Sequence, residues 1–187
     1  MRVIFIRHGK TSGNLEKRYI GKTDEPLCHE GENEIASREY PDADIVVSSP
    51  MKRCIQTAEL IYPNKKMKIY DGLRECDFGD FEGKNYIELS ENPDYQNWID
   101  SGGTLPFLNG EAHEDFAYRC VSAFEKAVYD NRNSESAAFI VHGGTIMAVL
   151  EKYAEPKRSF YDYQVKNGCG YITEFENGKI RIAKEIL

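Results

Sequence analysis

Apolar residues in this chain gather into short continuous runs, separated by longer stretches in which they recur every three or four positions. A short continuous run is typical of a strand buried on both faces of a sheet, whereas the longer spacing indicates a helix with one buried face. We expect strands at residues 3–6, 44–48, 66–70, 138–141, 168–175 and 179–186. The dipeptide Asn177-Gly178, which favours a tight turn, joins the last two into a predicted hairpin.

Helices are expected mainly between these strands, and the longest of them places Phe116, Cys120 and Phe124 at near-helical spacing. The predicted helices are residues 11–20, 31–40, 50–62, 84–100, 110–131 and 145–153. Thr11 or Ser12 is the predicted cap of the first helix, and Pro93 is expected to interrupt the fourth. Strands that alternate with helices predict an α/β fold with helices on both faces of one sheet.

The bulk properties are those of one globular domain, because the chain has 187 residues of which 41% are apolar. A net charge of −7 argues against nucleic acid as a partner, since a phosphate backbone attracts basic surfaces. No signal peptide is expected, and no stretch approaches the roughly 18 apolar residues that a membrane helix needs. The five cysteines lack C-x-x-C spacing, which favours reduced thiols in the cytoplasm over a disulfide scaffold.

Reactive residues follow three of the predicted strands, at the edge where open α/β sheets bind ligands. The segments are Arg7-His8-Gly9, Ser48-Ser49-Pro50 and His142-Gly143-Gly144. Two of them share the order strand, His-Gly, helix, and a helix N-terminus attracts an anion. The alternative for each histidine is a strand-end side chain that bonds to the backbone. Repetition of the pattern beside cations favours one shared anion site.

The cations nearest to these segments are Arg7, which precedes His8, and Arg53, which lies one turn into the helix after Ser49-Pro50. A guanidinium group matches phosphate oxygens with two parallel hydrogen bonds. The leaving group of a phosphate ester also needs a proton, which a partly buried carboxyl group can supply. Spacing alone does not choose among four carboxylates that follow the third strand: Glu75, Asp77, Asp80 and Glu82.

Four segments carry these residues in a fixed order along the chain. They are R-H-G-K-T-S-G-N from residue 7, S-S-P-M-K-R-C-I-Q-T-A from residue 48, L-R-E-C-D-F-G-D-F-E-G from residue 73 and V-H-G-G from residue 141. Together they resemble the motifs of the histidine phosphatase superfamily. The resemblance implies a phosphoglycerate-mutase-like fold, that is, a three-layer α/β/α sandwich around a mostly parallel sheet, in a single domain over residues 1–187.

The resemblance also implies a role for each matched residue. His8 is then the nucleophile that becomes phosphohistidine, and Glu75 is the proton donor and later the base that activates water. The phosphoryl oxygens are then held by Arg7, Arg53, His142, Asn14 and the Gly143 N–H. The physical chemistry agrees, because imidazole is readily neutral at cellular pH and clustered cations stabilise charge on a transferring phosphoryl group.

Residues 18–27, R-Y-I-G-K-T-D-E-P-L, resemble a stretch of the α-ribazole phosphatase-like members of this superfamily. That resemblance implies α-ribazole phosphate as a candidate substrate, with Gly21 and Thr23 among the substrate-binding residues. Met147 departs from it, because many such phosphatases carry an arginine at that place. Residues 84–115 are expected to cover the site and to recognise the leaving group.

The predicted function is that of a metal-independent acid phosphatase-type phosphomonoesterase with no cofactor. Its expected partner is a small phosphorylated metabolite, with neither nucleic acid nor membrane, and a homodimer is left open. The alternatives are a phosphoglycerate mutase-type phosphotransferase and a non-catalytic phosphate-binding regulatory module. A metallohydrolase is disfavoured, since the four histidines show no metal-ligand spacing.

Overall fold

A computed structural model describes residues 1–187 and contains one six-stranded sheet of order β3-β2-β4-β1-β5-β6. The strands are β1 (Arg2–Arg7), β2 (Ile45–Ser48), β3 (Met67–Ile69), β4 (Ser136–Val141), β5 (Gly170–Glu176) and β6 (Lys179–Ile186). Four of them, β3, β2, β4 and β1, pair in parallel, and β5 and β6 add an antiparallel hairpin at one edge. All six predicted strands are therefore confirmed, in a mostly parallel sheet.

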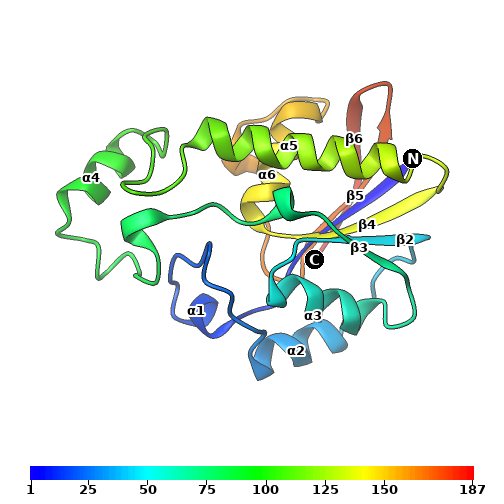
Figure 1. The fold of residues 1–187 in the computed structure, drawn as a ribbon, viewed down its shortest axis with the longest axis horizontal. Coiled ribbons are helices and arrows are strands. Elements are labelled where there is room, and N and C mark those ends of the chain that lie inside the picture. The colour runs from blue at the N-terminus through cyan, green and yellow to red at the C-terminus, as the bar shows by residue number, and fades with distance from the viewer.

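Helices cover both faces of this sheet, as predicted. They are α1 (Ser12–Leu15), α2 (His29–Ala36), α3 (Lys52–Ile61), α4 (Pro93–Asp100), α5 (His113–Asp130) and α6 (Gly143–Tyr153). Figure 1 shows α2 and α3 on one side of the strands and α5 and α6 on the other. This arrangement is the three-layer α/β/α sandwich.

Alternate residues of the central strands face the two helical layers, which gives the molecule two cores. On the side of α5 and α6, Phe5 of β1 and Phe139 of β4 pack on Phe124 of α5, with ring centroids 5.3–5.7 Å apart. On the other side, Ile4 of β1 lies in a separate cluster with Ala58 of α3. Every residue of β4 is buried, so the strand that leads to His142 lies in the middle of the sandwich.

Two predicted helices are much shorter in the structure than in the prediction, and the helix expected at residues 31–40 is α2, which already ends at Ala36. The one expected at residues 11–20 is only α1, which ends at Leu15, and Lys17 then adopts a left-handed φ of 56°. The one expected at residues 84–100 is helical only in α4, because Pro93 starts the helix after the Asn92 cap instead of interrupting it. Proline disfavours helix in the residue before it but fits the first turn.

The α4 region stands apart from the sandwich, on the side where β1 ends (Figure 1). A small cluster of Phe81, Leu89 and Tyr95 holds it together, with Tyr19, Trp98 and Phe107 packed against that cluster. Arg18 ties it to the main body through hydrogen bonds to Glu88 and to the Gly83 carbonyl. The segment therefore lies beside the carboxyl ends of the parallel strands.

Candidate active site

The sheet brings the three strand-end segments together. β1 and β4 are neighbours, with Arg7 opposite Val141, so His8 and His142 leave the sheet side by side. Their ring centroids are 5.2 Å apart, and Ser49 at the end of β2 lies 2.8 Å from His142 Nε2. The predicted convergence of these segments at one edge is confirmed.

His8 has one ring nitrogen engaged and one free. Its Nδ1 lies 2.7 Å from the Gly9 carbonyl oxygen, which can only accept, so Nδ1 carries the proton. The lone pair is then on Nε2. Only 4% of the residue is exposed, and this burial, followed by the charges of Arg53 and Arg7, holds the pKa of His8 well below its usual value. The ring is therefore a neutral imidazole, the form that can attack phosphorus.

His142 has the opposite tautomer. Arg53 Nε donates to its Nδ1 at 3.3 Å, so the proton is on Nε2 and points to Ser49 Oγ. Burial and the adjacent Arg53 charge lower the pKa of His142 well below the usual value as well. Both Arg53 and His142 are completely buried behind His8, and neither lines the cavity described below. Their direct contact with a phosphoryl group stays a prediction.

Gly21 and Thr23 hold Arg53. Their carbonyl oxygens each accept a hydrogen bond from the Arg53 guanidinium at 2.8 Å, and their N–H groups both donate to Glu82 Oε1 at 2.9 Å. A side chain at Gly21 would place its Cβ 1.8 Å from the Cys76 carbonyl oxygen. Neither residue lines the cavity, so in this structure both support Arg53 instead of facing a substrate.

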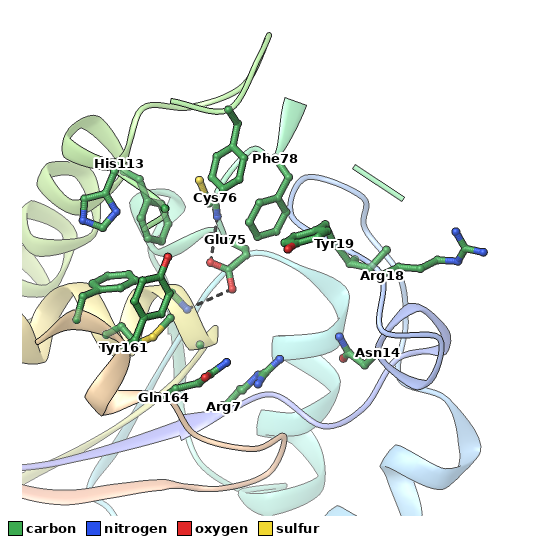
Figure 2. Close-up of a pocket in the computed structure, with 18 of the residues that line it drawn as sticks. Arg7, Asn14, Arg18, Tyr19, Glu75, Cys76, Phe78, His113, Tyr161 and Gln164 are labelled. Carbon is green, nitrogen blue, oxygen red and sulfur yellow. Dashed lines mark hydrogen bonds between the residues drawn. The ribbon is translucent and has the colours of Figure 1, made fainter. Parts of the chain in front are cut away.

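His8 lines a cavity of about 470 Å³, and Figure 2 shows Arg7, Asn14 and Glu75 around this cavity. Five of the residues expected at the site line it: Arg7, His8, Asn14, Glu75 and Gly143. Asn14 Oδ1 accepts from the Thr11 N–H and from Asn167 Nδ2, which leaves the Asn14 amide N–H groups for a ligand.

Arg7 supplies positive charge to this cavity. Its Nη1 donates to the Val165 carbonyl, while its buried Nε has no hydrogen-bond partner. Neither Arg7 nor Arg53 forms a salt bridge, whereas Lys10, Arg18 and Arg119 do. The positive charge behind and beside His8 is therefore not paired with a carboxylate at salt-bridge distance, which favours a bound dianion.

Asn167 is a site residue that the sequence gave no reason to single out. It lies just before β5 and lines the cavity beside Asn14. Its Nδ2 donates to the His8 carbonyl and to Asn14 Oδ1, both at 3.1 Å. Asn167-Gly168 reads locally as a turn dipeptide, and only the antiparallel pairing of β5 with β1 brings it to His8.

Among the four candidate carboxylates, only Glu75 lines the cavity. Its Oε1 accepts from the Cys76 N–H at 3.1 Å and its Oε2 from the Gly144 N–H at 3.4 Å. Burial raises the pKa of Glu75, although these N–H groups and the charges of Arg53 and Arg7 oppose the shift. A Cβ at Gly144 would lie 2.4 Å from Glu75 Oε1, so a glycine is needed for this approach.

The other three carboxylates have different partners. Asp77 forms a salt bridge with Lys22, Asp80 accepts from the Asn109 amide, and Glu82 binds the backbone of Gly21 and Thr23. The structure thus separates Glu75 from its neighbours, which spacing alone did not do.

Aromatic side chains form the wall of the cavity away from Arg7 and His8. They are Tyr19, Phe78, Trp98, Phe107, Phe116, Phe160 and Tyr161. Trp98, Gly103, Phe107 and His113 come from residues 84–115, the segment expected to cover the site. Tyr86 of the same segment is instead 51% exposed, and Tyr95 is buried in the cluster around α4.

The structure contains neither a candidate metal site nor a candidate membrane-spanning helix. No three histidine, cysteine or carboxylate groups gather in an arrangement that could hold a metal ion. None of the helices has both the length and the apolar character needed to cross a bilayer.

The hydrogen bonds predict opposite tautomers for two neighbouring histidines. At pH 6, ¹⁵N NMR should show a neutral His8 with its proton on Nδ1 and a neutral His142 with its proton on Nε2. The His8→Ala and His142→Ala variants assign the two sets of signals. A doubly protonated ring at either position would contradict the geometry.

Comparison with known proteins shows the family of this chain. Residues 3–185 match the profile of a family described as histidine phosphatase superfamily (branch 1). The Bacillus subtilis protein named uncharacterized phosphatase PhoE is 31% identical over 188 residues, which cover 96% of this chain and 91% of that protein. The Escherichia coli adenosylcobalamin/alpha-ribazole phosphatase is 25% identical, covering 90% of this chain and 87% of its own.

Solved structures show the same fold. A putative alpha-ribazole-5'-P phosphatase from Escherichia coli superposes with a TM-score of 0.88 at 21% identity, covering 100% of this chain and 96% of the other. A phosphoglycerate mutase from Thermus thermophilus superposes with a TM-score of 0.77 at 26% identity, covering 100% and 99%. The fold is thus phosphoglycerate mutase-like, and the chain belongs to the histidine phosphatase superfamily, branch 1.

Proposed function

We propose that this protein is a metal-independent phosphomonoesterase that hydrolyses small phosphorylated metabolites through a phosphohistidine on His8. The observation that carries the proposal is the state of His8. It is a neutral imidazole with a free Nε2, and it opens into a cavity that also contains Arg7 and Glu75. The family and the phosphatases among its relatives support hydrolysis.

In the first step, Nε2 of His8 forms a bond to phosphorus while the bond from phosphorus to the leaving oxygen breaks. Arg7, the Asn14 amide and the Gly143 N–H at the start of α6 bind the phosphoryl oxygens, and the buried Arg53 adds positive charge. Glu75, whose pKa is raised by burial, gives its proton to the leaving oxygen. The Nδ1–H bond to Gly9 keeps the ring oriented.

In the second step, Glu75 is a carboxylate and acts as the base. It takes a proton from a water molecule as the water oxygen attacks the phosphohistidine. The bond from phosphorus to Nε2 breaks, which returns a neutral His8 and releases inorganic phosphate. Glu75 is then protonated again and ready for another cycle.

We also propose α-ribazole phosphate as the candidate substrate. The wall of aromatic side chains suits a flat ring, and about 470 Å³ is within the range of pockets that enclose a whole metabolite. Among the lining residues away from His8, Arg18 is paired with Glu16 and Glu88 and Met147 is neutral, whereas Lys17 forms no salt bridge. The aromatic wall therefore favours a leaving group that carries a flat ring.

Replacing His8 tests the chemistry. His8→Ala should abolish turnover of 4-nitrophenyl phosphate and remove the acid-labile phosphoenzyme, whereas wild type forms it on His8. His29→Ala is the matched control, because His29 is exposed on α2. Mass spectrometry that located the phosphate on another residue would contradict the proposal.

The raised pKa of Glu75 predicts how activity depends on pH. Proton donation requires the protonated carboxyl, so kcat/KM for an alkyl phosphate should fall about tenfold per pH unit above that pKa. Glu75→Gln cannot titrate, so this limb should disappear from its profile and its rate should be about 10²–10⁴-fold lower. A Glu75→Gln profile that keeps the same limb would assign the proton to another group.

Substrate preference tests the choice of metabolite. We expect kcat/KM for α-ribazole phosphate to exceed that for phosphoserine and 3-phosphoglycerate by at least about tenfold, since only the α-ribazole ring can stack on the aromatic wall of the cavity. Trp98→Ala should reduce the preference, and Tyr86→Ala, an exposed aromatic of the same segment, should not. Faster hydrolysis of the carboxylated phosphates would exclude α-ribazole phosphate while leaving the phosphatase chemistry intact.

A further inference from the structure

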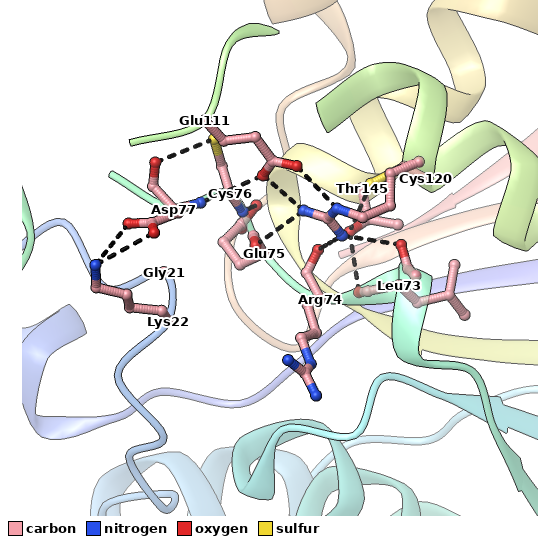
Figure 3. Close-up of polar contacts among 12 residues, drawn as sticks. Gly21, Lys22, Leu73, Arg74, Glu75, Cys76, Asp77, Glu111, Cys120 and Thr145 are labelled. Carbon is pink, nitrogen blue, oxygen red and sulfur yellow. Dashed lines mark hydrogen bonds and ion pairs between the residues drawn. The ribbon is translucent and has the colours of Figure 1, made fainter. Parts of the chain in front are cut away.

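Arg119 of α5 contacts the segment that carries Glu75. Its Nη1 donates to the carbonyl oxygens of Gly72 and Arg74, both at 3.0 Å, and its Nη2 donates to that of Glu75 at 3.3 Å. These carbonyls lie on both sides of the Glu75 side chain, as Figure 3 shows for Arg74 and Glu75. Arg119 thereby fixes the backbone before and at the proton donor.

Glu111 fixes Arg119 in turn. Its two carboxylate oxygens accept from Arg119 Nε at 2.9 Å and Nη2 at 2.7 Å, as a two-point ion pair. All five N–H groups of the guanidinium therefore have acceptors. The Glu111 backbone N–H donates to the Asp77 carbonyl at 2.9 Å, so the ion pair also contacts the segment after Glu75 (Figure 3).

The Glu75 segment lacks the regular hydrogen bonds of a helix or a strand. Residues 74–78 have no helical or strand structure, and the Glu75 carboxyl has two N–H partners, of which the Gly144 N–H is 3.4 Å away. A backbone without ladder hydrogen bonds needs side chains to fix it. Arg119 is positioned to do so, with hydrogen bonds to the Arg74 and Glu75 carbonyls and a third to the Gly72 carbonyl just before the segment.

We propose that Arg119, held by Glu111, is a positioning residue that places the Glu75 carboxyl for proton transfer. The inference rests on the proposed function, because it takes Glu75 as the general acid and base. Arg119 does not line the cavity in front of His8, so it acts through Glu75 and not on the substrate. A lysine cannot replace it, since an ammonium group lacks the planar fork that reaches several carbonyls and a carboxylate together.

The test separates the two chemical steps. With 4-nitrophenyl phosphate the first transfer needs little protonation, because nitrophenolate is a stable anion, whereas hydrolysis of the phosphohistidine needs Glu75 as base. Arg119→Lys should therefore keep the pre-steady-state burst of nitrophenol within about twofold and lower steady-state turnover by about 10- to 100-fold. Phosphohistidine should accumulate.

Two further variants make the result specific. Glu111→Gln leaves Arg119 in place but removes its charge partner, and it should show the same pattern to a smaller degree. Lys126→Ala removes an exposed cation from the same helix and should behave as wild type. In the Glu75→Gln background, Arg119→Lys should cause no further loss beyond about threefold, because both changes affect one function.

The outcomes distinguish the two proposals. If the losses from Arg119→Lys and Glu75→Gln multiply, or if the burst is lost together with turnover, Arg119 does not act through Glu75 and the positioning role is wrong. Wild-type turnover through phosphohistidine would still support the phosphatase in that case. If wild type forms no phosphohistidine, the phosphatase proposal itself fails, and the role given to Arg119 fails with it.

Discussion

The site depends on keeping His8 neutral beside two arginines. Burial of the ring and the charges of Arg53 and Arg7 act in the same direction, and each disfavours protonation. The Gly9 carbonyl then decides which nitrogen keeps the single proton, and so which one is free to attack. A more exposed histidine would be protonated for much of the time at acid pH and would lose its nucleophilic lone pair.

The same constraint explains how Arg53 is held. A carboxylate next to this guanidinium would cancel the charge that depresses the pKa of His8 and that attracts a phosphate dianion. The structure instead surrounds Arg53 with carbonyl oxygens of Gly21 and Thr23 and with His142 Nδ1, which satisfy its N–H groups without neutralising it. Glu82 does not contact Arg53 directly. Its carboxylate accepts hydrogen bonds from the N–H groups of Gly21 and Thr23, whose carbonyl oxygens bind Arg53.

Local patterns predicted the elements and the edge of the sheet where the site lies, because strands and strand ends are visible in the order of apolar residues. They did not predict the partners of Gly21, Thr23 and Asn167, which depend on contacts between segments far apart in the chain. The motifs identified Glu75 among four candidate carboxylates. The structure gives the physical difference between them, because Glu75 is buried at the cavity while the other three carboxylates bind other partners. The predicted interruption of a helix at Pro93 was wrong, because a proline breaks a helix that has already begun but fits the first turn of a new one.

His8 and Glu75 are held in different ways, and this matters for the reaction. His8 directly follows β1, which pairs with β4 on one side and β5 on the other, so the sheet itself fixes its backbone. Glu75 has no such support, and its position depends on Arg119 and on the close approach of Gly21 and Gly144. The proposed nucleophile is therefore held by the main-chain hydrogen bonds of the sheet. The carboxyl proposed to serve first the leaving group and then water is held instead through a side chain, that of Arg119.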